Sequence, residues 1–101
     1  MKMRFGLIKG RHELPEVDGY FFEGDVNPLD PQGLEQEARK FLQSQPYIEE
    51  IDLYVTGLTV ALIAALNVIN PRIKVVLYHF NRDTGEYYPQ PVYREAMPYG
   101  Y

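Results

Sequence analysis

The chain has 101 residues, a formal net charge of −4 at neutral pH and no cysteine. Its length predicts one domain with a single small core. Its acidic balance argues against binding of long nucleic acid, which requires a basic face. The lack of cysteine excludes disulfides and thiolate metal sites and is typical of a reducing compartment, so we expect a cytoplasmic protein. No apolar run is long enough to span a bilayer as a helix, which takes about 20 residues.

The first half of the chain contains two expected strands and one expected helix. Residues 3–8 form the first apolar segment, and residues 20–23 form a second, aromatic segment that is strand-prone. Asp30 is a suitable helix cap and Pro31 a suitable first helical residue, and Pro46 would end this helix. Its apolar stripe, at helical spacing, consists of Leu34, Ala38, Phe41 and Leu42.

The second half is expected to supply, in order, a strand at residues 51–55, a helix at 58–69, a strand at 74–80, a hairpin loop at 81–85 and a strand at 86–92. Pro89 and Pro91 remove backbone donors from the last strand, which predicts that it lies at a sheet edge. We expect the domain to span residues 1–93 and to be followed by a tyrosine-rich tail, residues 94–101.

Alternation of strands and helices predicts a mostly parallel sheet, because a strand–helix–strand unit is parallel and right-handed. The expected order is β-β-α-β-α-β-β, a minimal Rossmann-like α/β fold of two or three layers with an antiparallel edge strand. The loop at residues 10–19 leaves the direction of the first strand open. A hairpin there would make that strand antiparallel to the rest, whereas a crossover would make it parallel.

The second expected helix is apolar on nearly all sides, with Thr59 and Asn67 as its polar residues. A helix of this kind needs burial on more than one side. A five-stranded monomer with two helices covers only one side of it. We therefore expect a homodimer in which the remaining side meets a second copy.

A candidate ligand site follows the third expected strand, within the stretch "LYVTGLTVALIAALN". Thr56, Gly57, Leu58 and Thr59 lie where this strand becomes the second helix. A helix start presents free backbone N–H groups and a partial positive charge, glycine permits a sharp turn, and threonine adds a hydroxyl donor. These features are typical of a phosphate site. The alternative interpretation is a tight turn in which a threonine only caps the helix.

Both histidines of the chain fall at the same expected edge. His79 lies at the end of the fourth strand, and Asn81 and Arg82 follow that strand. Arg11 and His12 join them if the first strand is parallel. His79 and His12 are candidate acids or bases, or else a backbone-bonded and a surface residue, and Arg82 is a candidate phosphate clamp or a surface ion-pair residue. We expect no metal site, since two histidines with distant carboxylates match no ligand spacing.

The order of these pieces resembles the small CRISPR-associated proteins of the Csx type, which have a reduced CARF-like fold. The stretches "GLIKGRHELPE", "LYVTGLTVALIAALN" and "VVLYHFNRDTGEYY" carry the resemblance. Several of these proteins are ring nucleases that cut cyclic oligoadenylate messengers. Some carry an Asp-x-Arg-x-Gly pattern in the closing hairpin. Here Asn81 replaces the acid and Arg82 is offset by one position, a departure that affects cleavage more than binding.

The resemblance implies a symmetric dimer that binds a cyclic oligoadenylate across its two-fold axis without a cofactor. It also implies metal-independent cleavage, in which a ribose 2′-hydroxyl attacks its own phosphate in line. Two alternatives stay open: a sponge that binds the nucleotide without cutting it, and a non-enzymatic protein-interaction module. Under the resemblance, catalysis falls to His79, His12 and Thr59, and phosphate binding to Thr56, Gly57, Leu58, Thr59, Asn81, Arg82 and Arg11.

Overall fold

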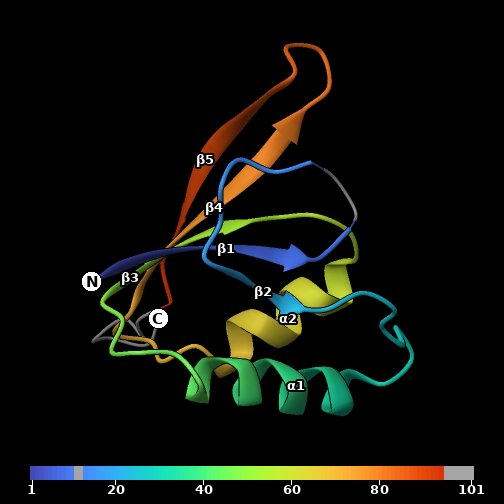
Figure 1. Ribbon diagram of the computed structural model, residues 1–101, viewed down its shortest axis with the longest axis vertical. Helices are drawn as coiled ribbons and strands as arrows, with labels where there is room; N and C mark the ends of the chain where they lie inside the picture. The colour runs from blue at the N-terminus through green and yellow to red at the C-terminus, as the bar shows by residue number, and fades with distance from the viewer. Residues whose placement is uncertain (11–12, 95–101) are drawn as a thin grey trace, which may run out of the picture.

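Five strands and two helices form an α/β domain in the computed structural model, which describes residues 1–10 and 13–94 (Figure 1). The predicted order β-β-α-β-α-β-β is confirmed, and the strands and the second helix start and end within one residue of their predicted bounds. In chain order the elements are β1 (Lys2–Ile8), β2 (Gly19–Phe22), α1 (Pro31–Gln43), β3 (Glu50–Tyr54), α2 (Thr59–Val68), β4 (Lys74–Asn81) and β5 (Glu86–Val92).

The strands form one sheet in the order β2-β1-β3-β4-β5. β1 is parallel to both β2 and β3, and β4 is parallel to β3, whereas β5 is antiparallel to β4. Of the two directions left open for the first strand, the parallel one is therefore observed, and residues 9–18 form a crossover. The prediction that the proline-containing strand lies at an edge is confirmed, because β5 is the last strand of the sheet.

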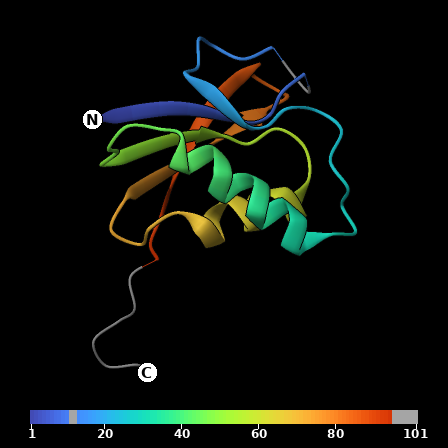
Figure 2. The same ribbon diagram turned by 60° about the horizontal axis from the view of Figure 1, so that its bottom comes forward.

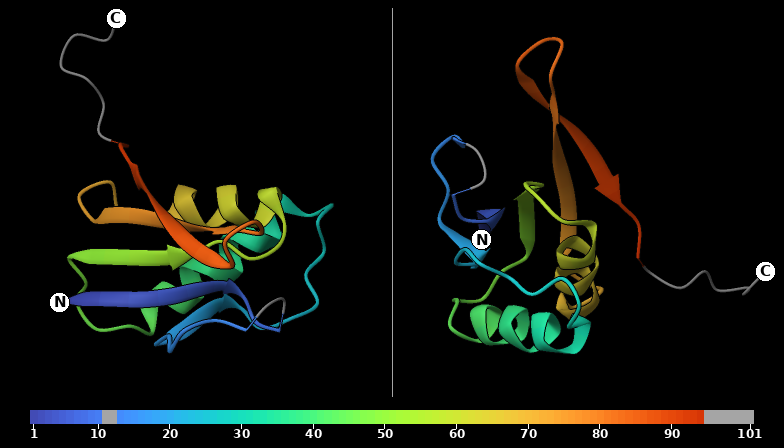
Figure 3. Two further views of the ribbon diagram at one scale, coloured as in Figure 1. Left: turned by 90° about the horizontal axis from the view of Figure 1, so that it is seen from above. Right: turned by 90° about the vertical axis from the view of Figure 1, so that its right-hand side faces the viewer.

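The handedness of the crossovers decides what covers each face of the sheet. The steps from β2 to β3 and from β3 to β4 run in one direction across the sheet, and the step from β1 to β2 runs in the other. Right-handed crossovers therefore place α1 and α2 on one face and the described part of the β1–β2 connection, residues 13–18, on the opposite face. Figure 1, Figure 2 and Figure 3 show the two helices side by side on the same face. On the other face Leu14 lies against Gly6, where an added Cβ would come within 2.8 Å of Leu14 Cδ1.

The hydrophobic core lies between the sheet and the two helices. Alternate residues of the strands point into it, because side chains of a strand alternate between the two faces. The ring of Phe41 in α1 contacts Phe5 and Phe21, at centroid distances of 4.9 and 5.0 Å. α2 contributes small residues that permit close approach to the sheet, namely Ala61, Ala64 and Ala65. Neither helix of the described part of the chain has the length and apolarity needed to cross a bilayer.

β4 and β5 extend past the rest of the sheet as a two-stranded arm. Pairing between β3 and β4 ends at Tyr54 and Tyr78, but pairing between β4 and β5 continues to Asn81 and Glu86. Figure 1 and Figure 3 show this hairpin projecting beyond the other strands. An isolated two-stranded hairpin is only marginally stable in water. The stability of the arm therefore depends on its aromatic contacts, such as that between the rings of Phe80 and Tyr87, whose centroids are 5.3 Å apart.

Arg94 ties the end of β5 to the end of α2. Its guanidinium donates hydrogen bonds to four backbone carbonyl oxygens, those of Leu66 (3.3 Å), Ile69 (2.7 Å), Asn70 (3.0 Å) and Ile73 (2.8 Å). Burial lowers the pKa of this guanidinium from its ordinary value. α2 has no basic residue in its own last turn, so Arg94 supplies the positive charge that a helix C-terminus favours.

Replacing Arg94 by alanine is expected to lower the free energy of unfolding by about 2 kcal/mol, because four carbonyl oxygens lose a charged donor while water reaches some of them. Arg94→Lys should recover only part of this loss, since an ammonium has three donors and no planar fork. Urea denaturation followed by circular dichroism measures both values. Equal stability of Arg94→Ala and the unchanged chain would contradict the anchoring role.

Candidate functional site

The carboxyl-terminal edge of the parallel strands contains a point where neighbouring chain segments diverge. After β1 the chain crosses to β2 on one side, and after β3 it passes through α2 to β4 on the other side. Open parallel sheets bind ligands in the crevice outside the strand ends at such a point. Residues 55–58, which connect β3 to α2, lie there, as the sequence predicted for a parallel first strand.

α2 begins at this edge without a side-chain cap. Its N-cap residue is Leu58, which is extended (φ −83°, ψ 136°) and makes no side-chain hydrogen bond to the helix. Gly57 has a φ of +105°, a conformation that residues with a Cβ rarely adopt, so this turn requires glycine. Gly57 and Thr59 are both exposed, and the first turn of α2 contains no acidic residue. The first N–H groups of α2, which carry the positive end of the helix dipole, therefore have no acidic or capping side chain as acceptor.

Thr56 is buried, and its side chain is hydrogen-bonded within the protein. It is 1% exposed, and its hydroxyl accepts a hydrogen bond from the Ile8 N–H at 3.2 Å and donates one to the Ile8 carbonyl at 3.1 Å. The backbone pairing of β1 with β3 ends at Gly6 and Tyr54. The Thr56 side chain consequently replaces the pairing that Ile8 loses when β3 turns toward α2. The Thr56 hydroxyl is therefore used to join β1 to β3 and does not face a ligand, whereas Thr59 is exposed.

His79 lies level with the β3–α2 turn. The Val55 N–H donates to the carbonyl of Tyr78 at 2.9 Å, which places the next residue, His79, beside that turn. Its ring contacts Tyr88 at a centroid distance of 5.4 Å, and its Nε2 is 2.7 Å from Oε1 of Gln90. Because a glutamine oxygen only accepts, Nε2 is the donor in this hydrogen bond, and Nδ1 is the ring nitrogen left to accept.

Asn81 and Arg82 lie farther from the start of α2 than the sequence predicted. The Asn81 side chain accepts from the Asp83 N–H at 2.9 Å, and the Asn81 carbonyl accepts from the Gly85 N–H at 2.8 Å, so Asn81 shapes the hairpin turn. Arg82 is exposed in the loop between β4 and β5. Figure 1 shows this loop as the far tip of the arm, away from α2. Within one chain, Arg82 and Gly57 are not brought together.

The turn after β1 contributes a cation that sequence reasoning overlooked. Lys9 directly follows β1, is exposed, and has its Nζ 3.8 Å from Oε2 of Glu23. A basic residue immediately after the first strand is a signal that the sequence contains. Arg11 and His12, the other candidates of this turn, lie outside the described residues.

The sheet face without helices carries a group of tyrosines and one buried acid. Tyr54 stacks on Tyr78 at a centroid distance of 4.9 Å and meets Tyr87 edge-on at 5.1 Å. Asp52 is 4% exposed, and its Oδ2 is 3.2 Å from Lys2 Nζ, a hydrogen bond that raises the pKa of Lys2. Oδ1 of Asp52 and the hydroxyl of Tyr87 are buried without a hydrogen-bond partner. Burial raises the pKa of Tyr54 and of Tyr87 above the ordinary value.

These pKa shifts predict a loss of stability at alkaline pH. Tyrosine in the unfolded chain has a pKa of 10.0. In the folded state the pKa of Tyr54 and that of Tyr87 are higher, so both side chains keep their protons to a higher pH. The unfolded state therefore releases these protons first, so the stabilisation is complete below pH 10.0 and declines as the pH rises through the folded values. Melting temperatures measured from pH 7 to pH 11 should fall above about pH 10.

The variant Tyr87→Phe tests whether ionisation of Tyr87 contributes to the fall in melting temperature at alkaline pH. Tyr87→Phe should melt at or above the temperature of the unchanged chain at neutral pH, because it removes a buried hydroxyl that has no partner. Its melting temperature should also fall less steeply above about pH 10. A large loss of stability at neutral pH would show that the Tyr87 hydroxyl is bound after all.

Within residues 1–10 and 13–94, no three histidine or carboxylate side chains come together in a way that could hold a metal ion. Comparisons with protein-family models, with curated proteins and with solved structures found no match to this chain.

Proposed function

We propose that this protein binds a cyclic oligoribonucleotide of the cyclic oligoadenylate type, as a homodimer, at the turn between β3 and α2. The observation that carries the proposal is the start of α2, which is exposed and uncapped at the point where the chain diverges between β1 and β3. A cytoplasmic location, which the lack of cysteine favours, is part of the same proposal.

Phosphate oxygens are suitable partners for this turn. The N–H groups at the start of α2 can donate to an anionic oxygen, and the helix dipole favours negative charge there. Gly57 has no side chain, so the backbone can approach a ligand closely. The exposed Thr59 hydroxyl adds a donor, and Lys9, which follows β1, would add positive charge if it left its exposed ion pair with Glu23. These groups recognise phosphate and ribose more than any particular base.

A second copy of the chain would cover exposed apolar surface on α2 and β5, which extends along α2 toward its C-terminal end. Ile63 of α2 is 49% exposed and Tyr88 of β5 is 50% exposed, and Ile63 also lines a groove with Leu66 and Val92. A two-fold dimer through this face would present two copies of the α2 start to one ligand. A cyclic oligonucleotide has matching rotational symmetry. The arm of one copy would carry Arg82 toward the site of the other, which a single chain does not achieve.

Cleavage is a second and separate step of the proposal. In-line attack by a ribose 2′-hydroxyl needs positioning and charge stabilisation, with a side chain that moves the proton. His79 is the described residue suited to that role, because imidazole commonly transfers protons in enzymes and Nδ1 is left to accept. Nδ1 would take the proton of the attacking 2′-hydroxyl as the 2′-oxygen bonds to phosphorus, the bond from phosphorus to the 5′-oxygen would break, and the 5′-oxygen would leave with a proton from water, while Nε2 stays bound to Gln90.

Isothermal titration with cyclic triadenylate, tetraadenylate and hexaadenylate tests binding, and mass spectrometry of the same mixtures tests cleavage. We expect saturable binding of one ring size at one ring for each two chains, with a raised melting temperature. The linear oligonucleotide of equal length is the control and should bind more weakly, since it loses more conformational freedom. Binding without product would identify a sponge. No binding of any ring would overturn the proposal and favour a protein-interaction module.

A further inference from the structure

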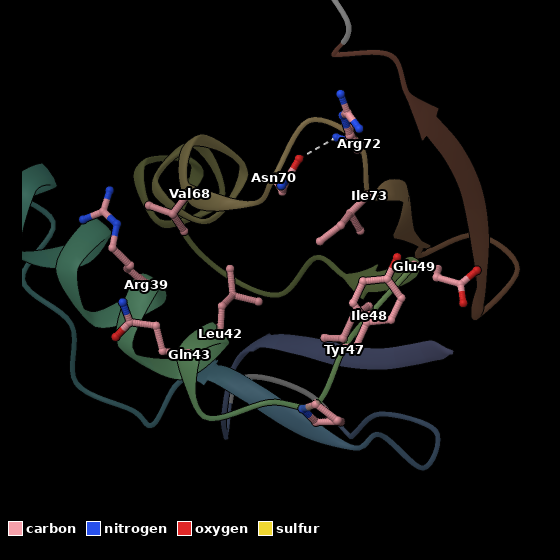
Figure 4. A pocket seen from close by; sticks show the side chains of 11 residues that line it. Arg39, Leu42, Gln43, Tyr47, Ile48, Glu49, Val68, Asn70, Arg72 and Ile73 are labelled. Carbon is pink, nitrogen blue, oxygen red and sulfur yellow. Dashed lines mark hydrogen bonds between the residues drawn. The ribbon is translucent and has the colours of Figure 1, made fainter.

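A cavity of about 720 Å³ lies at the amino-terminal edge of the sheet, opposite the carboxyl-terminal edge that contains the β3–α2 turn. The ends of α1 and α2 and the segments that precede β3 and β4 surround it (Figure 4). Its apolar surface includes four branched aliphatic side chains, those of Leu42, Ile48, Val68 and Ile73, and Pro46 and Tyr47 add to it. Figure 4 shows Leu42 and Ile73 pointing into the space from opposite sides. This volume is in the range of cavities that bind ligands or peptide side chains.

Two arginines flank this apolar surface. Arg39 lies on the α1 side and Arg72 on the side of the loop before β4 (Figure 4). No ion pair joins either guanidinium to a carboxylate among the described residues. Glu49, the acid that lines the cavity, is paired with the N-terminal ammonium at 2.9 Å. The cavity therefore presents two uncompensated cations in a chain of net charge −4.

The ends of the helices do not account for these two cations. A helix C-terminus favours a positive charge, which could explain arginines at this edge. α1, however, already has Lys40 in its last turn, and the carbonyls at the end of α2 already accept hydrogen bonds from Arg94. Arg39 and Arg72 are therefore available to an anionic partner.

The composition of the cavity rim is that of a protein-binding surface. Tyr47 lines it and is 79% exposed. Tyrosine and arginine are enriched at protein interfaces and among the residues that dominate binding energy, and aliphatic side chains form the pocket that an anchor residue fills. The separation of Arg39 and Arg72 across the aliphatic surface favours a ligand with an apolar centre and negative charge toward both ends.

We propose that this cavity is a docking site for an extended peptide segment of a partner protein, in which an apolar side chain is flanked by acidic ones. The apolar anchor enters the space between Leu42 and Ile73. The flanking carboxylates pair with Arg39 and Arg72, and Tyr47 packs against the peptide. This site is on the opposite edge from the β3–α2 turn, so it does not depend on nucleotide binding.

Fluorescence polarisation with a labelled peptide of sequence Asp-Glu-Leu-Phe-Glu-Asp tests the proposal on the full chain. We expect saturable binding that weakens with added salt, because the flanking contacts are ionic. Two control peptides separate the contributions: one in which lysines replace the acids, and one in which serines replace Leu-Phe. Both controls should bind at least about tenfold more weakly, since each loses one half of the recognition.

Charge reversal locates the peptide on the protein. Arg39→Glu and Arg72→Glu should each weaken binding by about tenfold, which is the effect of about 1.4 kcal/mol. Lys40→Glu is the matched control, because Lys40 is exposed on α1 next to Arg39 but does not line the cavity, and its affinity should change less than about twofold. Circular dichroism confirms that each variant folds. Absence of saturable binding, equal binding of the lysine peptide, or equal effects of Arg72→Glu and Lys40→Glu would each overturn the proposal. Saturation of the site by decanoate alone, without peptide binding, would overturn it in favour of a small-molecule cavity.

Discussion

Thr59→Glu is expected to weaken binding of the cyclic oligonucleotide by about a hundredfold or more while leaving the fold intact, since like charges in contact cost several kcal/mol. The new carboxylate would sit at the first residue of α2, compete for the same N–H groups and repel the phosphates. For the helix itself the change is favourable, because α2 has no acid in its first turn and a carboxylate there contributes roughly 0.3–1 kcal/mol. Loss of binding with unchanged or raised stability therefore distinguishes a ligand site from damage to the fold.

Two control variants make this result specific. Thr59→Gln keeps a polar, uncharged side chain at the helix start and should retain affinity within about threefold, as expected for a surface substitution without new charge. Gln36→Glu adds the same net charge at an exposed position of α1, away from the β3–α2 turn, and should leave affinity nearly unchanged. If Thr59→Glu and Gln36→Glu lowered affinity equally, the effect would be one of overall charge, and the proposed site would be wrong.

Thr56→Val is expected to lower the free energy of unfolding by about 3 kcal/mol, since each unpaired buried polar group costs roughly 1–3 kcal/mol. Valine has nearly the same shape as threonine, so little packing is lost. The hydroxyl, however, is the partner of both the N–H and the carbonyl of Ile8, in a position that is 1% exposed. Both backbone groups would be left without that partner at the end of β1.

Urea denaturation of three variants checks the role of Thr56. Thr56→Ser keeps the hydroxyl and should lose only about 1 kcal/mol, the contribution of one buried methyl group. Thr59→Val, at the exposed threonine of the same turn, should change stability by less than about 0.5 kcal/mol. A Thr56→Val protein as stable as the unchanged chain would contradict the assignment of this hydroxyl to the β1–β3 connection.

Local signals in the sequence were sufficient to predict the helices and strands and part of the candidate site. Asp30 and Pro31 mark the start of α1 because a cap and a first-turn proline act within a few residues, and the Asp30 carboxylate does accept from the Gly33 N–H at 3.1 Å. Pro89 and Pro91 marked an edge strand because each lacks a backbone donor. Gly57 marked the sharp turn before α2, which its φ of +105° confirms.

Contacts between residues distant in the chain decided the direction of β1, the hydrogen-bond partner of Thr56 and the distance of Arg82 from Gly57. The direction of β1 depends on how the chain connects β1 to β2, where Leu14 packs on Gly6, and no local pattern distinguishes this connection from a hairpin. The partner of the Thr56 hydroxyl is Ile8, 48 positions away, so its structural role follows from strand order. The length of the β4–β5 arm separates Arg82 from Gly57, although the sequence placed both at strand ends.

The sequence by itself therefore determined the kind, order and bounds of the elements, because propensities, caps and turns are physical properties of neighbouring residues. Only the tertiary structure decided which polar groups face solvent and which are used within the fold. Hydrogen bonds such as those of Arg94 to the end of α2 join segments more than 20 residues apart, with separations of 21 to 28. Their partners are set by the order of strands in the sheet and the handedness of the crossovers, which act on the chain as a whole.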